Sequence, residues 1–312
     1  FDAHRTPLPD APDTVNGGPG NDFIRGDDGD VISGGEGDDR FCICVNQDPR
    51  LIQDSSDAET VTITDFNPDT ERVRITLIGG LDERVSAWEP RLNEINAELG
   101  YPDRQITWRQ MANQVSCYGL VEAPGTAFAY NDWQMALLCD TLYTRVYGAT
   151  WERVDAQVLH PGLTGLLGCE DDPTLLAFGL NDRPGRLGIS PRDFCRFGLL
   201  YLREGNWRGV QLIGQAHATM AVSDPLPATL PRAGLEAAEM IPGQRSHGSR
   251  RVPDNQTEHW GSYSWLWWIN GVDREGQRMW PDAPPDTYGA FGHGGPRAMV
   301  VVPSLDLGIS YN

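Results

Sequence analysis

A short glycine- and aspartate-rich repeat restricts what the first part of this chain can fold into. Its copies are Gly17–Arg25, Gly26–Ser33 and Gly34–Cys42, and the middle copy is one residue short. They follow the pattern Gly-Gly-x-Gly-x-Asp-x-U-x, in which the glycines form turns with positive φ and U is a large apolar residue that packs inward. The inward positions are Ile24, Ile32 and Phe41. The fixed period predicts a short parallel β-roll and argues against the alternative, a flexible acidic linker.

The turns of this repeat offer hard oxygen atoms, which are the ligands that Ca²⁺ prefers. The candidate metal-site residues supply turn carboxylates and loop carbonyls; they are Asp22, Asp30, Asp39, Gly18, Gly20 and Gly37. These residues resemble the RTX family of extracellular calcium-binding repeats. The resemblance implies Ca²⁺ as cofactor and secretion from a bacterium, because millimolar calcium is found outside cells. A stable solenoid usually needs at least three full repeats, so we expect one or two weak sites.

The composition of the chain changes near Gly79-Gly80. Residues 1–13 are rich in Pro and Asp and are expected to be a linker, followed by the repeats at 14–45. Alternating apolar residues in 46–80 predict a β-hairpin that flanks the repeat. Residues 81–312 form the second predicted domain.

Helical signals dominate the first part of that second domain. Helices are expected at about 90–100, 107–115, 132–148 and 190–205, on the basis of apolar spacing and capping residues. Strands are expected at Tyr263–Asn270, Ala298–Val302 and Leu307–Tyr311, and the tryptophans of the first are expected to build the core of the sheet or the wall of a cleft rather than to bind sugars. This order predicts an α/β (α+β) fold in which a helical domain packs on a mixed or antiparallel sheet.

Three motifs in the second domain carry a further resemblance. They lie at 106–132, 189–209 and 292–306. In order and spacing they resemble the superfamily of class C β-lactamases, DD-peptidases and esterases, over about residues 81–312. That resemblance implies a serine hydrolase that acts on an ester, amide or β-lactam carbonyl, with a small ester, amide or peptidoglycan-like ligand. It also implies that Tyr130 is the turn tyrosine, that Asp132 stands where Asn is usual, and that His293, Gly294 and Gly295 form the strand motif, whose glycines let a substrate approach the backbone.

The chain departs from this family in its nucleophile. All 25 basic residues are Arg, so a Ser-x-x-Lys motif cannot occur in this sequence, and the repeat occupies the place where it should lie. Without a cationic neighbour, only about one tyrosine in a thousand is phenolate at pH 7, and Tyr130 loses its use as a base. Pro296 follows the glycine pair and has no N–H to offer an oxyanion. Ser86, Ser116 and Ser190 are poor substitutes, and Ser190 is better explained as a helix cap.

Charge and composition exclude some partners. The net charge of −19 argues against nucleic acid and anionic membranes, and no apolar stretch is long enough to span a membrane. Most of the six cysteines are expected to be buried free thiols. Because the sequence starts with neither Met nor a signal peptide, we expect a processed or internal fragment. Three interpretations stay open: an impaired secreted hydrolase, a catalytically silent binding module, and a fusion of two unrelated gene fragments.

Overall fold

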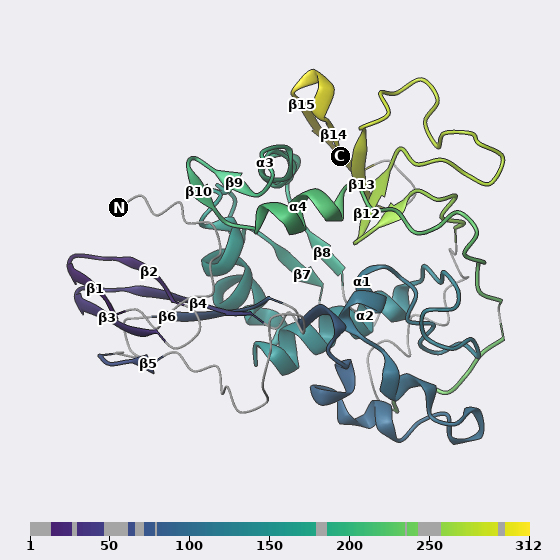
Figure 1. Ribbon diagram of the computed structural model, residues 1–312, viewed down its shortest axis with the longest axis horizontal. Helices are drawn as coiled ribbons and strands as arrows, with labels where there is room; N and C mark the ends of the chain where they lie inside the picture. Colours follow the sequence, from purple (N-terminus) through teal and green to yellow (C-terminus); the bar gives the residue numbers. More distant parts are fainter. Residues whose placement is uncertain are drawn as a thin grey trace. The chain divides into compact units, whose positions relative to one another are not determined.

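The computed structural model describes residues 14–26, 30–46, 62–65, 72–78, 80–178, 186–234, 236–242, 257–292 and 297–312 (Figure 1). The chain divides into two compact units, Phe1–Glu83 and Arg84–Asn312. The expected linker at 1–13 lies outside the described residues. No helix in the described part of the chain is both long and apolar enough to cross a bilayer.

The described residues of unit 1 form two small parallel sheets and a 3₁₀ turn at Gly80–Asp82. One sheet contains β1 (Thr14–Pro19), β3 (Val31–Glu36) and β5 (Thr62–Ile63), and the other contains β2 (Phe23–Gly26), β4 (Arg40–Asn46) and β6 (Arg72–Ile78). Each pairing in both sheets is parallel. Consecutive strands therefore alternate between the sheets.

The two sheets of unit 1 share a small core. Ile24, Ile32 and Phe41 are buried together, and Ile63 packs against them. This confirms that the apolar residue of each repeat packs inward. The hairpin predicted for 46–80 is wrong, since β5 pairs with β3 and β6 pairs with β4. Alternation in the sequence identified the strands, but it cannot tell a hairpin from two strands that each extend a different sheet.

Unit 2 is built around a five-stranded antiparallel sheet. In spatial order its strands are β11 (Tyr263–Ser264), β12 (Trp267–Ile269), β13 (Tyr288–Gly292), β14 (Arg297–Val302) and β15 (Leu307–Tyr311). Two-stranded antiparallel pairs are formed by β7 (Leu176–Phe178) with β8 (Arg186–Gly188) and by β9 (Asn206–Trp207) with β10 (Val210–Gln211). The strands expected at 298–302 and 307–311 are confirmed.

The segment expected to be a single strand at 263–270 is a hairpin. Trp265 and Leu266 form its turn with φ of 46° and 70°. Both residues lie in the left-handed region, which a bulky side chain adopts only where its surroundings impose it. Sequence reasoning missed this turn because neither residue is a usual turn former. Trp265, Trp267 and Trp268 are buried, as expected for core residues.

The longest α-helix, α3 (Pro191–Leu202), packs on one face of this sheet. The ring of Phe197 stacks on Trp267 with 5.8 Å between centroids. Gly198 allows the helix to approach β14, because a Cβ there would come within 2.4 Å of the Met299 sulfur. Ser190 caps the helix by accepting a hydrogen bond from the Asp193 N–H, as predicted.

The other helices of unit 2 are short. They are α1 (Trp108–Ala112), α2 (Asp132–Asp140), α4 (Gln215–Ala221), two π-helical segments at Thr141–Val146 and Asp155–Thr164, and 3₁₀ turns at Val85–Ala87, Pro90–Asn93, Ala97–Leu99, Pro102–Gln105, Trp151–Arg153 and Pro303–Leu305. The capping box of Thr107 and Gln110 is confirmed. The helix expected at 90–100 is replaced by separate 3₁₀ turns, although Leu92 and Ile95 are buried as its pattern suggested.

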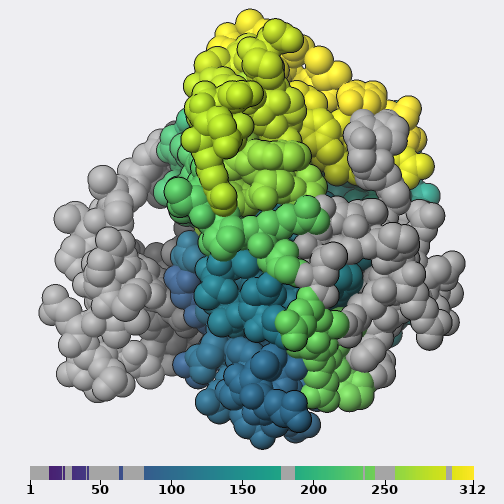
Figure 2. Space-filling model, turned by 90° about the vertical axis from the view of Figure 1, so that its right-hand side faces the viewer, coloured from purple at the N-terminus to yellow at the C-terminus, as the bar shows by residue number. Residues whose placement is uncertain are grey.

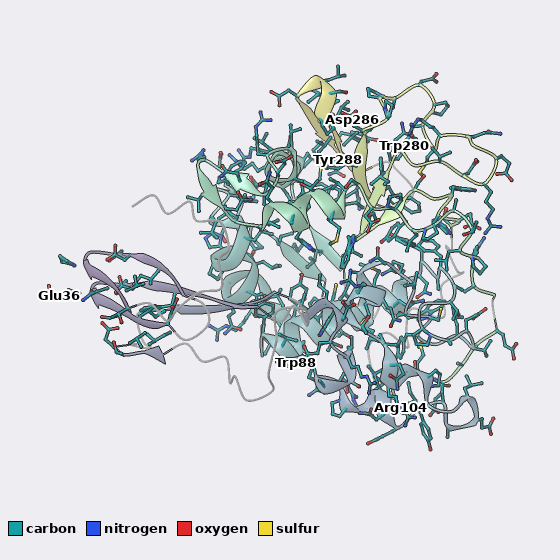
Figure 3. All side chains as sticks on the ribbon, in the orientation of Figure 1. Glu36, Trp88, Arg104, Trp280, Asp286 and Tyr288 are labelled. Atoms are coloured by element: carbon teal, nitrogen blue, oxygen red, sulfur yellow. The ribbon has the colours of Figure 1, made fainter. Side chains whose placement is uncertain are left out.

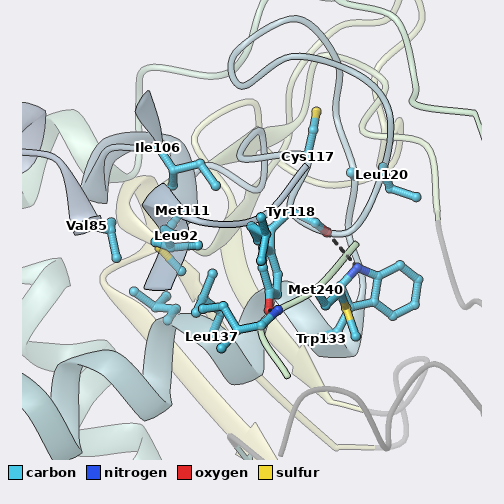
Figure 4. Packing of buried hydrophobic residues seen from close by; sticks show 14 of the residues in the cluster. Val85, Leu92, Ile106, Met111, Cys117, Tyr118, Leu120, Trp133, Leu137 and Met240 are labelled. Atoms are coloured by element: carbon cyan, nitrogen blue, oxygen red, sulfur yellow. Dashed lines mark hydrogen bonds between the residues drawn. The ribbon is translucent and has the colours of Figure 1, made fainter. Parts of the chain in front are cut away.

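A segment around 226–241 connects the sheet to these helices; it is the green stretch beside the blue residues in Figure 2. Leu226 donates to the Tyr263 carbonyl over 2.8 Å, and bridges join Phe128 to Arg232 and Leu120 to Ala237. The segment contributes Ala233, Met240 and Ile241 to an extensive core cluster (Figure 4). There the Trp133 indole donates to the Tyr118 carbonyl over 2.8 Å, and the Tyr118 hydroxyl accepts from Ile241 N–H over 2.9 Å.

Candidate functional site

On one side of unit 1, the turn between β1 and β2 stacks directly on the turn between β3 and β4; we call these the first and second turns. Gly18 lies opposite Gly35, and the Gly20 N–H donates to the carbonyl of Glu36, a residue labelled in Figure 3, over 2.7 Å. Gly18, Gly20 and Gly37 have φ of 95°, 125° and 146°, the conformations for which the repeat needs glycine. This stacking brings the two following aspartates together.

Asp22 and Asp39 share one hydrogen bond and each keep one oxygen unused. The Asp22 N–H donates to Asp39 Oδ1 over 2.8 Å. The Oδ2 atoms of both residues are buried and accept no hydrogen bond from the described residues, and Asp39 is 1% exposed. Buried carboxylate oxygens without a donor are costly, so this pair could hold a cation.

Two glycines make room for these carboxylates. A Cβ on Gly34 would lie 2.1 Å from Asp39 Oδ2, and one on Gly17 would lie 2.8 Å from Asp22 Oδ2. No group of at least three His, Cys, Asp or Glu side chains suited to a metal ion occurs within the described ranges. Backbone carbonyls of the turns would therefore have to complete any coordination shell, which Ca²⁺ accepts.

The third predicted metal-site aspartate, Asp30, does not join this pair. Asp22 and Asp39 precede β2 and β4, whereas Asp30 precedes β3, at the turns on the opposite side of the sheets. It is 7% exposed and has its own interactions. The sequence period alone treats all three aspartates alike, because it does not distinguish the two sides of alternating turns.

In unit 2, Tyr130 belongs to an aromatic cluster. Its half-buried ring lies 5.8 Å from Tyr263 and 6.0 Å from Trp268 between centroids, and it stacks on Phe128 at 6.4 Å. Asn131 then caps α2 by accepting from the Gln134 N–H, which places Asp132 in the first turn of that helix. Tyr130 is therefore fixed both by ring contacts and by its position before a helix.

The serines considered as substitutes for the missing nucleophile all have structural partners. The Ser116 hydroxyl is buried and donates to Gln134 Oε1. Ser190 caps α3, and Ser86 donates to the Arg104 carbonyl over 3.1 Å. Within the described ranges, none of these three hydroxyls forms a hydrogen bond with a His, Asp, Glu or Tyr side chain, the kind of general base that an activated serine requires.

The predicted strand motif cannot be located. His293, Gly294 and Gly295, with Pro296, lie outside the described residues, between β13 and β14. Cys117, Cys139, Cys169 and Cys195 are free thiols, of which Cys117 and Cys139 are buried and the other two are half-buried. Burial raises the pKa of the Cys117 thiol to about 12, so this thiol is not a thiolate nucleophile near neutral pH.

Sequence reasoning missed a buried carboxyl group in unit 2. Asp103 is 4% exposed, and Asn96 Nδ2 donates to its Oδ2 over 2.6 Å. Burial, aided by the nearby charge of Glu239, outweighs this hydrogen bond and raises the pKa of Asp103 to about 6. The local sequence gave no signal, because the partners of Asp103 include a residue 136 positions along the chain (239 − 103).

Comparisons with known proteins yield only distant matches. No protein-family profile and no curated protein matches the chain. Among solved structures it is similar to a provisionally assigned 6-aminohexanoate-dimer hydrolase from Bacillus anthracis, at 13% identity and a TM-score of 0.44 over 74% of this chain and 59% of the other. It is also similar to a provisionally assigned β-lactamase from Bacteroides dorei, at 14% identity and a TM-score of 0.47 over 74% and 70%. A third similar structure is a β-lactamase from Mycobacterium bovis, at 15% identity and a TM-score of 0.43 over 74% and 77%.

The chain thus spans 59% of the length of the first of these structures. All three are described as hydrolases or β-lactamases. Likenesses at this level assign no activity to the chain, and its functional residues have to be argued from its own geometry.

Proposed function

We propose that unit 1 binds calcium between its first two turns and that the chain is a secreted calcium-binding protein with a β-lactamase-related second unit. The observation that carries this proposal is the pair of buried oxygens, Asp22 Oδ2 and Asp39 Oδ2, which lack a donor among the described residues. A dication would compensate both charges, and flexible coordination by carboxylates and carbonyls suits Ca²⁺ better than the small, strictly octahedral Mg²⁺. Calcium is abundant outside cells, so the proposal includes an extracellular location.

Calcium binding is tested by thermal and urea unfolding of the full chain with and without millimolar CaCl₂. A ligand at about a hundredfold excess over its dissociation constant stabilises the folded form by about 2.7 kcal/mol. We expect such a gain for the wild type and its loss in Asp39→Asn. Asp38→Asn is the matched control, because this exposed neighbour carries the same charge and contributes its N–H rather than its carboxylate to the turn. An unchanged unfolding transition on adding calcium would overturn the proposal.

For unit 2 we propose a serine-hydrolase-like domain that binds an ester, amide or peptidoglycan-like ligand and does not turn it over efficiently. The three motifs in family order support the relationship. The partners of Ser86, Ser116 and Ser190 support the loss of efficient turnover, because each hydroxyl already serves the fold. Acyl transfer needs a hydroxyl whose proton is taken by a neighbouring base, and the chain contains no Lys that could serve beside Tyr130.

The test is the intact mass of the protein after incubation with a fluorophosphonate and with a labelled penicillin, each with and without Ca²⁺. We expect no stoichiometric adduct and no hydrolysis of a chromogenic ester above that of a Tyr130→Phe variant. Saturable binding of the penicillin, measured by calorimetry, would support the binding role. A stoichiometric adduct would contradict impaired turnover, and peptide mapping would then identify the nucleophile.

A further inference from the structure

On the side of unit 1 that carries the first and second turns, the chain between β5 and β6 is the third turn. Its sequence departs from the repeat at the position where the other two turns begin with glycine. Ile63 pairs with Ile32, and Ile32 pairs with Val15, so two residues later Asp65 stands where the other turns have Gly34 and Gly17. At those two glycines a Cβ would collide with the carboxylate of the aspartate that follows five residues later. Asp65 has a Cβ, and the residue five positions after it is Thr70. In sequence, therefore, the third turn has neither the glycine nor the aspartate at the two positions that bring Asp22 and Asp39 together.

Asp65 instead points its carboxylate at the second turn. Its Oδ1 accepts from the Gly34 N–H over 3.0 Å, and its Oδ2 accepts from the Gly35 N–H over 2.9 Å and from the Ser33 hydroxyl over 2.7 Å. The Thr64 N–H adds a bond of 3.0 Å to the Ile32 carbonyl. These donors stabilise the ionised carboxylate and lower its pKa, the Ser33 hydroxyl most of all.

The contrast with Asp39 is direct. Both carboxylates lie between successive turns, but Asp65 receives three hydrogen bonds and Asp39 Oδ2 receives none from the described residues. A carboxylate with three donors is already compensated by the protein, whereas a buried one without a donor needs a cation.

We propose that Asp65 closes the calcium-binding array, so that this side of unit 1 holds one ion, between its first and second turns, and its third turn docks without metal. The proposal rests on the calcium site of Asp22 and Asp39 proposed above. Asp65 acts as a built-in cap of the repeat, which terminal repeats of stacked proteins generally need. Chelation would then loosen the first turn and leave the contact between the second and third turns in place.

The stoichiometry is tested by native mass spectrometry of the full chain in CaCl₂. We expect the wild type to hold one ion more than Asp39→Asn, and Asp65→Gly, which restores the glycine of the repeat, to keep that ion. A difference of two ions, or loss of the ion in Asp65→Gly, would overturn the inference. Equal ion counts in wild type and Asp39→Asn would instead overturn the calcium site itself.

Amide hydrogen exchange tests the cap independently of calcium. In the wild type we expect the amides of Gly34, Gly35 and Thr64 to stay protected in EGTA. Asp65→Gly should lower this protection about tenfold or more in EGTA and in calcium alike, the factor that corresponds to a hydrogen bond to a charged group. Ser33→Ala, which removes one donor of the three, should have a smaller effect. Protection that depends on calcium in the wild type, or that survives in Asp65→Gly, would contradict the role of Asp65.

Discussion

Asp39 in unit 1 and Asp193 in unit 2 are both buried carboxylates, and their surroundings differ in a way that distinguishes the proposed calcium ligand from a structural carboxylate. Asp193 accepts hydrogen bonds from the backbone N–H groups of Glu170 and Asp171 and forms an ion pair with Arg196. These donors overcome its burial and lower its pKa. Asp39 keeps one buried oxygen without a donor in the described part of the chain. A buried charge is thus no mark of function by itself; the absence of a compensating protein group is.

The same contrast holds for the units as wholes. Among the described side chains, three buried apolar residues form the core cluster of unit 1, whereas unit 2 has several clusters. An ion that binds only the folded form would add to the stability of unit 1. The candidate nucleophiles of unit 2 already serve the fold that surrounds them.

The largest expected effect is the loss of unit 1 on truncating its core. Phe41→Ala should cost about 3–5 kcal/mol, which exceeds the roughly 2.7 kcal/mol expected from calcium. Unit 1 should then be unfolded even in calcium, as seen by exchange of its strand amides. Phe128→Ala, a matched truncation in unit 2, should lower the melting temperature and leave that unit folded at 25 °C. Native-like protection of β4 in Phe41→Ala would show that unit 1 does not depend on this core.

A smaller effect, confined to unit 2, is expected from pH. The pKa of Asp103 is raised to about 6, against 3.8 for an ordinary Asp, chiefly because the group is buried. The folded state thus prefers the neutral acid. Its contribution is fully present below about pH 3.8 and is lost as pH rises through about 6. Two pKa units correspond to a loss on the order of 2–3 kcal/mol.

Urea unfolding of unit 2 between pH 4.5 and 8 measures this loss. Asp103→Asn keeps an acceptor for Asn96 and cannot ionise, so its stability should be flat across this window. Glu239→Gln should move the wild-type transition to lower pH, because the Glu239 charge contributes to the raised pKa. A wild type whose stability rises with pH over this range would contradict the assignment.

Short-range sequence patterns predicted the structural features that depend on neighbouring residues. The Thr107 capping box, the Ser190 cap and the strands β14 and β15 depend on residues within a few positions of each other, and the structure has them. The pairing of β5 with β3, the turn at Trp265 and the burial of Asp103 depend on residues far along the chain. The hydrogen bonds of Asp65 to the second turn span about 30 positions and were missed for the same reason. The pattern of a single sequence does not reveal contacts between residues that lie so far apart along the chain.

The smallest effect tests whether Ser190 belongs to the fold or to the chemistry. Its hydroxyl accepts from the Asp193 N–H over 3.3 Å at the first turn of α3, and loss of such a cap costs about 1 kcal/mol. Ser190→Ala should lower the stability of unit 2 by this amount, measured by urea unfolding, and, like the wild type, it should form no stoichiometric fluorophosphonate adduct. Thr107→Ala removes the capping box of α1 and is the matched control, with a similar cost expected. If the wild type and Thr107→Ala formed an adduct and Ser190→Ala did not, this hydroxyl would react with ligands and would belong to the chemistry of unit 2 rather than to its fold alone.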